Sequence, residues 1–244
     1  MQLPLEEFDK HRMEHKFYIS LSEAASLRAR LSQVMQKDPH SDPFGRYLIT
    51  SIYFDTPDGH SLLGSQAGLE KRKKIRIRAY NHSTSYIKIE YKEKNGKLSR
   101  KRGMRITLEE CNRILGGDPS PLLSHVTEGD TAPSGKSALA LQLYHDLHVN
   151  GYRPSTVVEY TREIFIHPIS RVRITLDTHI CGYHATKELF THHALLSTMA
   201  EDLVLLEVKY SHFLPAFIAT LLPHNCMTSI ATTLITDNDI SIFS

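Results

Sequence analysis

Cationic side chains recur at every second position in two neighbouring segments of this chain. In a β-strand, successive side chains point to opposite faces, so residues two apart share a face. Within 71–80, the residues that would share one face are cations: Arg72, Lys74, Arg76 and Arg78. Within 87–94, the equivalent face would carry Lys88, Glu90, Lys92 and Lys94, opposite Ile87, Ile89 and Tyr91. The two segments therefore predict strands with one apolar and one cationic face.

A row of cations suits a ligand whose negative charge is spread along its length, such as triphosphate or polyphosphate. Arginine donates several coplanar hydrogen bonds to phosphate oxygens, and lysine supplies a point charge. For one strand alone, a half-exposed sheet with a solvated basic face is the simpler explanation. The alternation recurs around Lys16, Arg162, Arg173 and Lys209, however, in a chain whose formal net charge is only +2. The one-sided cations are therefore not a by-product of a basic composition.

Carboxylates share these predicted faces. A hard cation such as Mg²⁺ is usually held by one or two carboxylates together with phosphate oxygens. Glu207 alternates with Lys209, and the pattern alone favours a metal ligand and a salt bridge equally. Glu14 and Glu90 are interpreted as charge partners of their neighbours, while Asp177 fits either role.

Strands separated by helices must position these faces. The predicted strands are 12–19, 47–55, 73–81, 86–94, 98–106, 155–166, 171–180 and 203–210. Capping boxes predict helices that start at Ser20–Glu23 and Thr107–Glu110. Further helices are predicted over 136–149, after Pro215 and around Ser61, whereas 116–135 is predicted to be a loop and a candidate for disorder.

Eight strands are enough to close a small barrel, and amphipathic helices would cover its apolar face. We therefore predict an α+β fold: an eight-stranded antiparallel β-barrel with helices packed on the outside, forming a single domain over residues 1–244. The charged face would line the interior. That interior must be wet, because unpaired charges are not tolerated in a dry core, and it would attract a polyanion.

Several classes of protein are disfavoured by the sequence. Cys111, Cys181 and Cys226 are widely separated, so neither a disulfide framework nor a zinc knuckle is expected, and a reducing compartment fits. Neither a secretory signal nor a run of about 20 apolar residues is seen, so we expect a cytoplasmic protein without a transmembrane segment. Glycine-rich phosphate loops and the common hydrolase motifs are absent. Aromatic residues are not interleaved with the cations, so nucleic acid is not an expected partner.

Taken in order, the motifs resemble the VTC-type domain of polyphosphate polymerases, within the triphosphate tunnel metalloenzyme (CYTH-like) superfamily. The matching segments are Arg12-x-Glu14-x-Lys16, Ser51-Ile-Tyr-Phe-Asp55, Lys74-Ile-Arg-Ile-Arg-Ala-Tyr80, Ile89-Glu-Tyr-Lys92, Tyr160-x-Arg162, Arg173-Ile-Thr-Leu-Asp177 and Leu206-Glu-Val-Lys-Tyr210. They span nearly the whole chain. The fold of the superfamily is an eight-stranded antiparallel tunnel, which agrees with the fold predicted from the alternation.

The resemblance implies a role for each matched position. The implied phosphate-binding residues are Lys16, Arg76, Arg78, Lys92, Lys97, Lys101, Tyr160, Arg162 and Arg173. Glu207 is the implied ligand of a divalent metal, Mn²⁺ or Mg²⁺, and Glu207 and Lys209 are the candidate catalytic residues. The expected partners are ATP, tripolyphosphate or polyphosphate. The sequence indicates no oligomeric state.

Two positions depart from the family pattern. Arg12 stands where the triphosphatases of the superfamily have a glutamate, which disfavours a thiamine-triphosphatase or adenylate-cyclase activity. Ala231 and Thr232 occupy the positions of a Ser-Lys pair whose lysine contacts the reacting phosphate, and Lys209 is a possible substitute. We therefore expect metal-dependent phosphoryl transfer, first of all polyphosphate synthesis from ATP. The alternatives are hydrolysis of tripolyphosphate or a nucleoside triphosphate, and non-catalytic polyphosphate binding.

Overall fold

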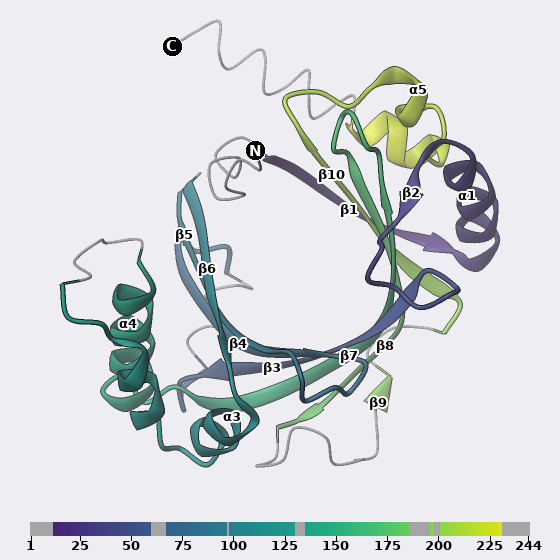
Figure 1. Ribbon diagram of the computed structural model, residues 1–244. Coiled ribbons are helices and arrows are strands. Elements are labelled where there is room, and N and C mark those ends of the chain that lie inside the picture. Colours follow the sequence, from purple (N-terminus) through teal and green to yellow (C-terminus); the bar gives the residue numbers. More distant parts are fainter. Residues whose placement is uncertain are drawn as a thin grey trace, which may run out of the picture. The chain divides into compact units, whose positions relative to one another are not determined.

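The computed structural model of the chain describes residues 12–59, 67–96, 98–129, 135–185, 196–197 and 201–230 (Figure 1). The strands are β1 (Arg12–Ser20), β2 (Gln36–Lys37), β3 (Arg46–Asp55), β4 (Lys71–Tyr80), β5 (Ile87–Asn95), β6 (Leu98–Ile106), β7 (Arg153–Ile166), β8 (Arg173–His184), β9 (Leu196–Ser197) and β10 (Leu203–Ser211). The helices are α1 (Leu21–Val34), α3 (Leu108–Leu115), the 3₁₀ helix η2 (Ser120–His125), α4 (Lys136–His148) and α5 (Ala216–Ala219). None of the helices in these ranges is long and apolar enough to cross a membrane.

The strands form one sheet in the order β1-β10-β8-β7-β3-β4-β5-β6, and β2 and β9 pair with β7 and β8. Antiparallel pairing and an α+β arrangement are confirmed. The predicted closed eight-stranded β-barrel is wrong, because β1 and β6 are the two ends of this order and no pairing between them closes the sheet in the described part of the chain. Side-chain alternation identifies the face on which a residue lies, but it carries no information on which strands pair.

Contacts divide the chain into two compact units. Unit 1 comprises 1–47, 161–178 and 199–244, and unit 2 comprises 48–160 and 179–198. Strands β3, β7 and β8 each contribute residues to both units. This continuity leaves the single domain over residues 1–244 as a prediction.

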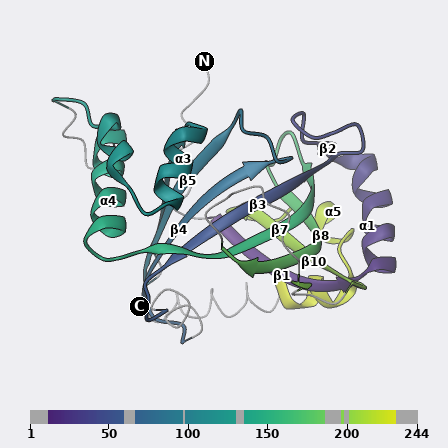
Figure 2. The ribbon, with the colours of Figure 1, turned by 90° about the horizontal axis from the view of Figure 1, so that it is seen from below.

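In unit 2, the apolar face of β4, β5 and β6 is buried beneath α3 and α4. Ile75, Ile77 and Ile89 are fully buried in one core with Leu143 of α4 and Ile114 of α3. Figure 2 shows the two teal helices beside β4 and β5. Ile75, Ile77 and Ala79 of β4 are thus held in an apolar core, so Arg76 and Arg78 between them lie on the opposite face, as the alternation predicted.

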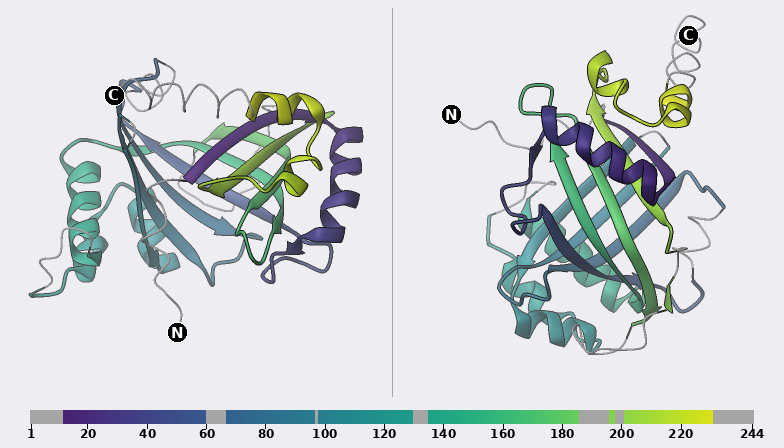
Figure 3. Two further views of the ribbon diagram at one scale, coloured as in Figure 1. Left: turned by 90° about the horizontal axis from the view of Figure 1, so that it is seen from above. Right: turned by 90° about the vertical axis from the view of Figure 1, so that its right-hand side faces the viewer.

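In unit 1, α1 covers the equivalent apolar face of β8 and β10. Ser20 and Glu23 form the predicted capping box at its start. Leu27 and Leu31 are fully buried with Leu176 of β8 and Leu206 of β10. Figure 3 shows α1 crossing these strands. Burial of Leu206 and Val208 turns Glu207 and Lys209 to the other face of β10.

Three local expectations need comment. The loop predicted over 116–135 contains η2, whose Leu122 is fully buried in the core of unit 2, so this part is ordered. The short strands β2 and β9 were missed because two residues are too few to show an alternation. The helix expected around Ser61 lies outside the described residues.

Candidate functional site

The charged face of β4, β5 and β6, here called the cationic face of unit 2, is set by strand register. Four rows cross it: Arg72–Lys94–Ser99, Lys74–Lys92–Lys101, Arg76–Glu90–Gly103 and Arg78–Lys88–Arg105. Within these three strands, Glu90 is the one carboxylate on this face. The cations on the face therefore greatly outnumber the negative charges that the strands themselves supply.

Glu90 binds two of these cations. Arg76 Nε donates to Glu90 Oε2 at 2.5 Å, and Lys101 Nζ lies 2.7 Å from Glu90 Oε1. Burial alone would raise the pKa of Glu90, but the charges of Arg76 and Lys101 outweigh it and lower the pKa to about 2. Arg76 also donates to the Tyr53 hydroxyl at 3.3 Å. Glu90 is thus the charge partner that the sequence predicted, and it is shared between two cations.

Arg78 is only 8% exposed, yet the contacts of its guanidinium are with hydroxyls. Its Nε donates to Ser51 Oγ at 3.3 Å, and its Nη2 donates to Tyr160 Oη at 3.3 Å. Among the described residues, no carboxylate forms a salt bridge with Arg78. The charge of Glu90 acts on Arg78 only without direct contact, because Glu90 is paired with Arg76 and Lys101. A buried guanidinium with so little compensating charge is costly, so this position favours binding of an external anion.

Lys92 lies between two other lysines. In register it faces Lys74 on β4 and Lys101 on β6, and its own side chain is exposed. Like charges directly opposite one another in a sheet are destabilising. An anion that spans several charges is therefore expected to relieve the repulsion within the row Lys74–Lys92–Lys101.

The face of unit 1 that carries Glu207 has a different composition. This mixed-charge face comprises Glu14 and Lys16 of β1, Glu207 and Lys209 of β10, Arg173, Thr175 and Asp177 of β8, and Arg162 of β7. Four of these groups form a ring of alternating charge. Lys16 Nζ lies 3.1 Å from Glu14 and 3.4 Å from Glu207, and Lys209 Nζ lies 3.4 Å and 3.0 Å from the same carboxylates.

The ring shifts the pKa values of Glu14 and Lys16. Burial would raise the pKa of Glu14, but its contact with Glu207 and the charges of Lys209 and Lys16 lower it well below the usual range. Burial would lower the pKa of Lys16, but Glu207 and Glu14 raise it. Both groups are therefore charged at neutral pH. The salt-bridge alternative for Glu207 is present in the structure, and it leaves the metal role as a prediction.

The two arginines of this face differ in their partners. Arg162 donates through Nε and Nη2 to the two oxygens of Asp177, both at 2.6 Å, a bidentate pair. Arg173 faces Lys209 across the β8–β10 pair, and its buried Nε has no hydrogen-bond partner within the described ranges. Such an orphaned donor is uncommon in native proteins. Arg173 is thus the better placed of the two to receive an external anion.

The donor set of unit 1 fits a hard divalent cation. Glu14 and Glu207 approach the same two lysine ammonium groups, so their carboxylates lie close together. The described residues contain no group of three or more His, Cys, Asp or Glu side chains suited to a metal. Proteins that act on phosphates usually bind Mg²⁺ through one or two carboxylates, while water and phosphate oxygens fill the other coordination positions of the metal.

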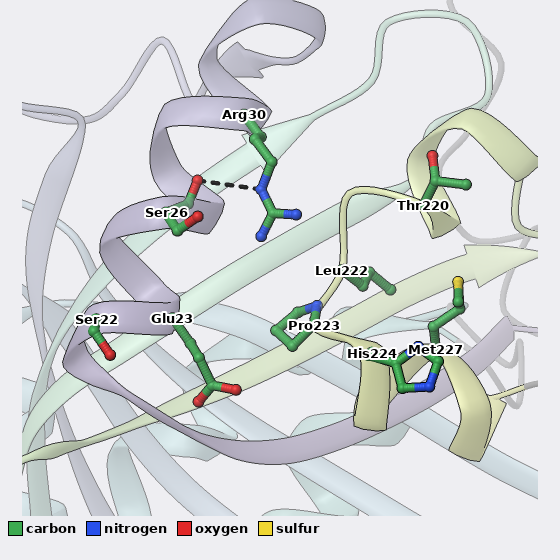
Figure 4. Close-up of a pocket in the computed structure, with 9 residues that line it drawn as sticks. All are labelled: Ser22, Glu23, Ser26, Arg30, Thr220, Leu222, Pro223, His224 and Met227. Atoms are coloured by element: carbon green, nitrogen blue, oxygen red, sulfur yellow. Dashed lines mark hydrogen bonds between the residues drawn. The ribbon is translucent and has the colours of Figure 1, made fainter.

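A groove on unit 1 lies apart from its mixed-charge face. It has a volume of about 510 Å³ and lies between α1 and the segment after α5 (Figure 4). Arg30 at its edge donates to the Ser26 carbonyl at 3.3 Å, and Glu23 caps α1. Because α1 packs on the apolar side of β8 and β10, this groove is not part of the candidate site.

The predicted site residues thus fall into two groups. Unit 2 brings together Arg76, Arg78, Lys92, Lys101 and Tyr160, and unit 1 brings together Lys16, Glu207 and Lys209, with the pair Arg162–Asp177 and Arg173 on the same face. Lys97 and Thr232 lie outside the described residues.

Sequence reasoning gave no role to Ser51 or Tyr53, although their alternation with Ile52 on β3 places both on the face of Arg76 and Arg78. The sequence also gave no sign that Glu14 and Glu207 lie close together. The register of β1 against β10 is needed to see that they meet, because 193 positions of chain lie between them.

Comparison with known proteins was made for the whole chain. No curated protein matches it. The structure is similar to a crystal structure from Bacillus halodurans of a protein provisionally named as an adenylate cyclase, with a TM-score of 0.46, 12% identity, and coverage of 91% of this chain and 89% of that one. The family described as the VTC domain matches residues 11–232. With most of its length matched, and with the ordered motifs on the two charged faces described above, this chain belongs to the VTC domain family.

Proposed function

We propose that this chain binds a linear phosphate chain and transfers a phosphoryl group, most specifically in the synthesis of polyphosphate from ATP. Membership of the VTC domain family supports triphosphate binding and phosphoryl transfer as the general class of activity. The finer assignment depends on the two charged faces, and each contributes something that phosphoryl transfer requires.

The observation that carries the proposal is Arg78. Its guanidinium is buried, is contacted by Ser51 and Tyr160, and lies in a face with a large excess of cations. Hydroxyls can orient a guanidinium without neutralising it, so its charge stays available for a phosphate oxygen. Arg76, fixed by Glu90 and Tyr53, would then present its remaining donors beside it.

The lysine row Lys74–Lys92–Lys101 extends this binding surface across three strands. A single phosphate ion would contact one part of it, whereas a chain of phosphates places a negative charge opposite each strand. Neighbouring strands are about 4.8 Å apart. The row therefore favours tripolyphosphate or polyphosphate over monophosphate.

In unit 1, Glu14 and Glu207 would hold Mg²⁺ or Mn²⁺. When bound, the cation would supply positive charge to phosphate oxygens and so stabilise the charge that develops during transfer. Arg173 would bind a phosphate oxygen through its unpartnered Nε. Lys209 would add a second positive charge close to Arg173, since the two residues face each other in register. The work of the protein in such a reaction is positioning and charge stabilisation.

The test is an incubation of the purified protein with ATP and Mn²⁺, in which polymer length and released phosphate are both measured. We expect polyphosphate to form. Tripolyphosphate binding is measured in parallel by calorimetry at low salt, with Arg78→Ala compared with Arg100→Ala. Arg100 lies on β6, on the other face of the sheet, opposite Glu93. Weak binding by Arg78→Ala alone supports the proposed site.

Three outcomes separate the possibilities. Free phosphate without polymer would identify a hydrolase acting at the same site. Tight tripolyphosphate binding without turnover would identify a binding module, the outcome that Thr232 at the family lysine position favours. No tripolyphosphate binding at low salt would overturn the phosphate assignment as a whole.

A further inference from the structure

Lys209 stands where a cation bound to Glu14 and Glu207 would have to stand. Its ammonium group lies 3.0 Å from Glu207 Oε2 and 3.4 Å from Glu14 Oε2, so it bridges the two carboxylates. Lys16 bridges the other two oxygens, Oε1 of each carboxylate. Two negative charges are thus satisfied by two lysines. A divalent cation therefore meets carboxylates that are already paired with internal cations.

The two lysines are not equivalent. The side chain of Lys16 is 54% exposed and that of Lys209 is 24% exposed, so Lys209 is the more enclosed of the pair. Lys209 also lies between β1 and β8, where it faces Glu14 on one side and Arg173 on the other. It therefore has an attractive neighbour and a repulsive neighbour within reach of one flexible side chain.

Arg173 supplies the other half of the arrangement. Its buried Nε has no hydrogen-bond partner in the described part of the chain, and no salt bridge neutralises its guanidinium there. An anion bound by this donor would also attract the Lys209 ammonium group. The structure shows Lys209 on the carboxylates, and a position beside an anion at Arg173 would be a second one within its reach.

We propose that Lys209 is an internal counter-ion that is exchanged when the site is loaded. Without a divalent cation, Lys209 holds Glu14 and Glu207 together. When Mg²⁺ or Mn²⁺ binds these carboxylates, Lys209 leaves them and binds, together with Arg173, a phosphate oxygen of the substrate. This inference rests on the proposed function, and it adds a regulatory property to it.

The consequence is coupling between the two ligands. Metal binding releases Lys209 for the phosphate chain, and a phosphate chain that attracts Lys209 frees the carboxylates for the metal. Each ligand then strengthens the binding of the other by the same factor, as linkage requires. Without a phosphate chain, the site would bind a divalent cation more weakly, because Lys209 competes with it for the carboxylates.

The first experiment measures binding of Mn²⁺ alone by calorimetry. If Lys209 competes with the metal, Lys209→Met should bind Mn²⁺ roughly 5–20-fold more tightly than wild type, which is the lower part of the range typical of site coupling. Lys209→Arg, which forms stronger carboxylate pairs, should bind Mn²⁺ more weakly than wild type. The control Arg173→Met also removes a nearby positive charge, but one without a carboxylate contact, so its gain should be under about 3-fold.

The second experiment observes Lys209 in the intact wild-type protein. The ¹⁵N signal of its ammonium group, assigned by comparison with Lys209→Arg, should shift on addition of Mg²⁺ and shift further with tripolyphosphate. In calorimetry, Mn²⁺ should strengthen tripolyphosphate binding to wild type, and this enhancement should shrink in Lys209→Met. The measurement on wild type does not depend on whether the variants fold.

The inference is overturned if Lys209→Met binds Mn²⁺ no more tightly than Arg173→Met, or if Mg²⁺ leaves the Lys209 signal in place. It also fails if tripolyphosphate binds tightly but wild type does not bind Mn²⁺, an outcome under which phosphate binding by the cationic face still stands. Absence of both tripolyphosphate and Mn²⁺ binding would overturn the proposed function itself.

Discussion

The two charged faces differ in how far their cations are paired with carboxylates of the same face. In unit 1, acidic residues lie on the same face as the cations and pair with them. Lys209 contacts Glu14 and Glu207, and Arg162 donates two hydrogen bonds of 2.6 Å to Asp177. In unit 2, Glu90 is shared by Arg76 and Lys101, while Lys92 faces two further lysines. The face of unit 1 is largely neutralised by its own side chains, with Arg173 as the exception, and the face of unit 2 is left with a larger excess of positive charge.

The difference indicates a division of labour. A face with paired carboxylates is suited to hold a metal cation, because its negative charges are already gathered and oriented. A face with excess cations is suited to hold a polyanion, because its repulsion is relieved only by a ligand. The comparison therefore predicts that changes to the carboxylates of unit 1 act on metal-dependent chemistry and that changes to the cations of unit 2 act on phosphate binding.

The largest expected effect comes from Glu207→Gln. The amide keeps the shape of the side chain but removes the charge that would hold the metal, so metal-dependent turnover should fall to background. Tripolyphosphate binding to unit 2 should change by less than about 3-fold, since the charge is not on that face. Turnover with Mn²⁺ and calorimetry with tripolyphosphate are the two measurements. A loss of phosphate binding that matches the loss of turnover would remove the distinction between the faces.

A second prediction concerns acid stability and Glu90. Its pKa is lowered from 4.5 to about 2 in the folded protein. A carboxyl group whose pKa is lower in the folded than in the unfolded protein stabilises the folded state. For Glu90 this contribution is fully present above about pH 5 and is lost as the pH falls towards 2. The loss by pH 2 should be roughly 3 kcal/mol, given a pKa lowered from 4.5 to about 2 and about 1.4 kcal/mol for each pKa unit.

The measurement is urea unfolding of wild type and Glu90→Gln between pH 6 and 2. The variant should be less stable at pH 6, and the gap to wild type should close towards pH 2. A gap that stays constant across this range would show that Glu90 is not held as a charged group by Arg76 and Lys101.

Much of this organisation can be predicted from the sequence. The alternation in β4 and β5 identifies their cationic and apolar faces, because Ile75, Ile77 and Ile89 report the core directly. The capping box at Ser20 is equally local. Sheet closure could not be predicted in this way, and neither could the hydroxyl contacts of Arg78, whose partners Ser51 and Tyr160 are 27 and 82 positions away.

Buried carboxylates on the apolar sides were also missed. Asp146 of α4 is fully buried and accepts a hydrogen bond from the Tyr91 hydroxyl of β5. Glu163 of β7 accepts one from Arg28 of α1 at 2.7 Å. A single acidic residue on a helix or strand gives no sign of a partner that is distant in sequence, since solvent is its usual neighbour. Both pairs attach a helix to the strands that it covers.

A third prediction tests Arg78 against Arg162. Arg78→Ala should weaken tripolyphosphate binding by about 1–3 kcal/mol, the range for hydrogen bonds to charged groups. Arg162→Ala should weaken tripolyphosphate binding less, because two donors of the Arg162 guanidinium are already bound to Asp177. Calorimetry at low salt measures both. An equal loss in the two variants would mean that Asp177 releases Arg162 when phosphate binds.

The smallest expected effect is a change in the stability of the ligand-free protein. It distinguishes the two faces clearly, because its sign is opposite for a lysine of unit 2 and a lysine of unit 1. Lys92→Met removes a lysine that faces Lys74 and Lys101, so the ligand-free protein should become more stable by about 0.2–1 kcal/mol. Lys16→Met removes a lysine that pairs with Glu14 and Glu207, so the ligand-free protein should become less stable by a similar amount. Urea unfolding at low salt measures both changes, and added salt should diminish each of them. With tripolyphosphate present, Lys92→Met should lose its advantage, because the bound anion relieves the repulsion in wild type. If both variants shift stability in the same direction without ligand, the excess charge of unit 2 is balanced by groups other than a phosphate ligand.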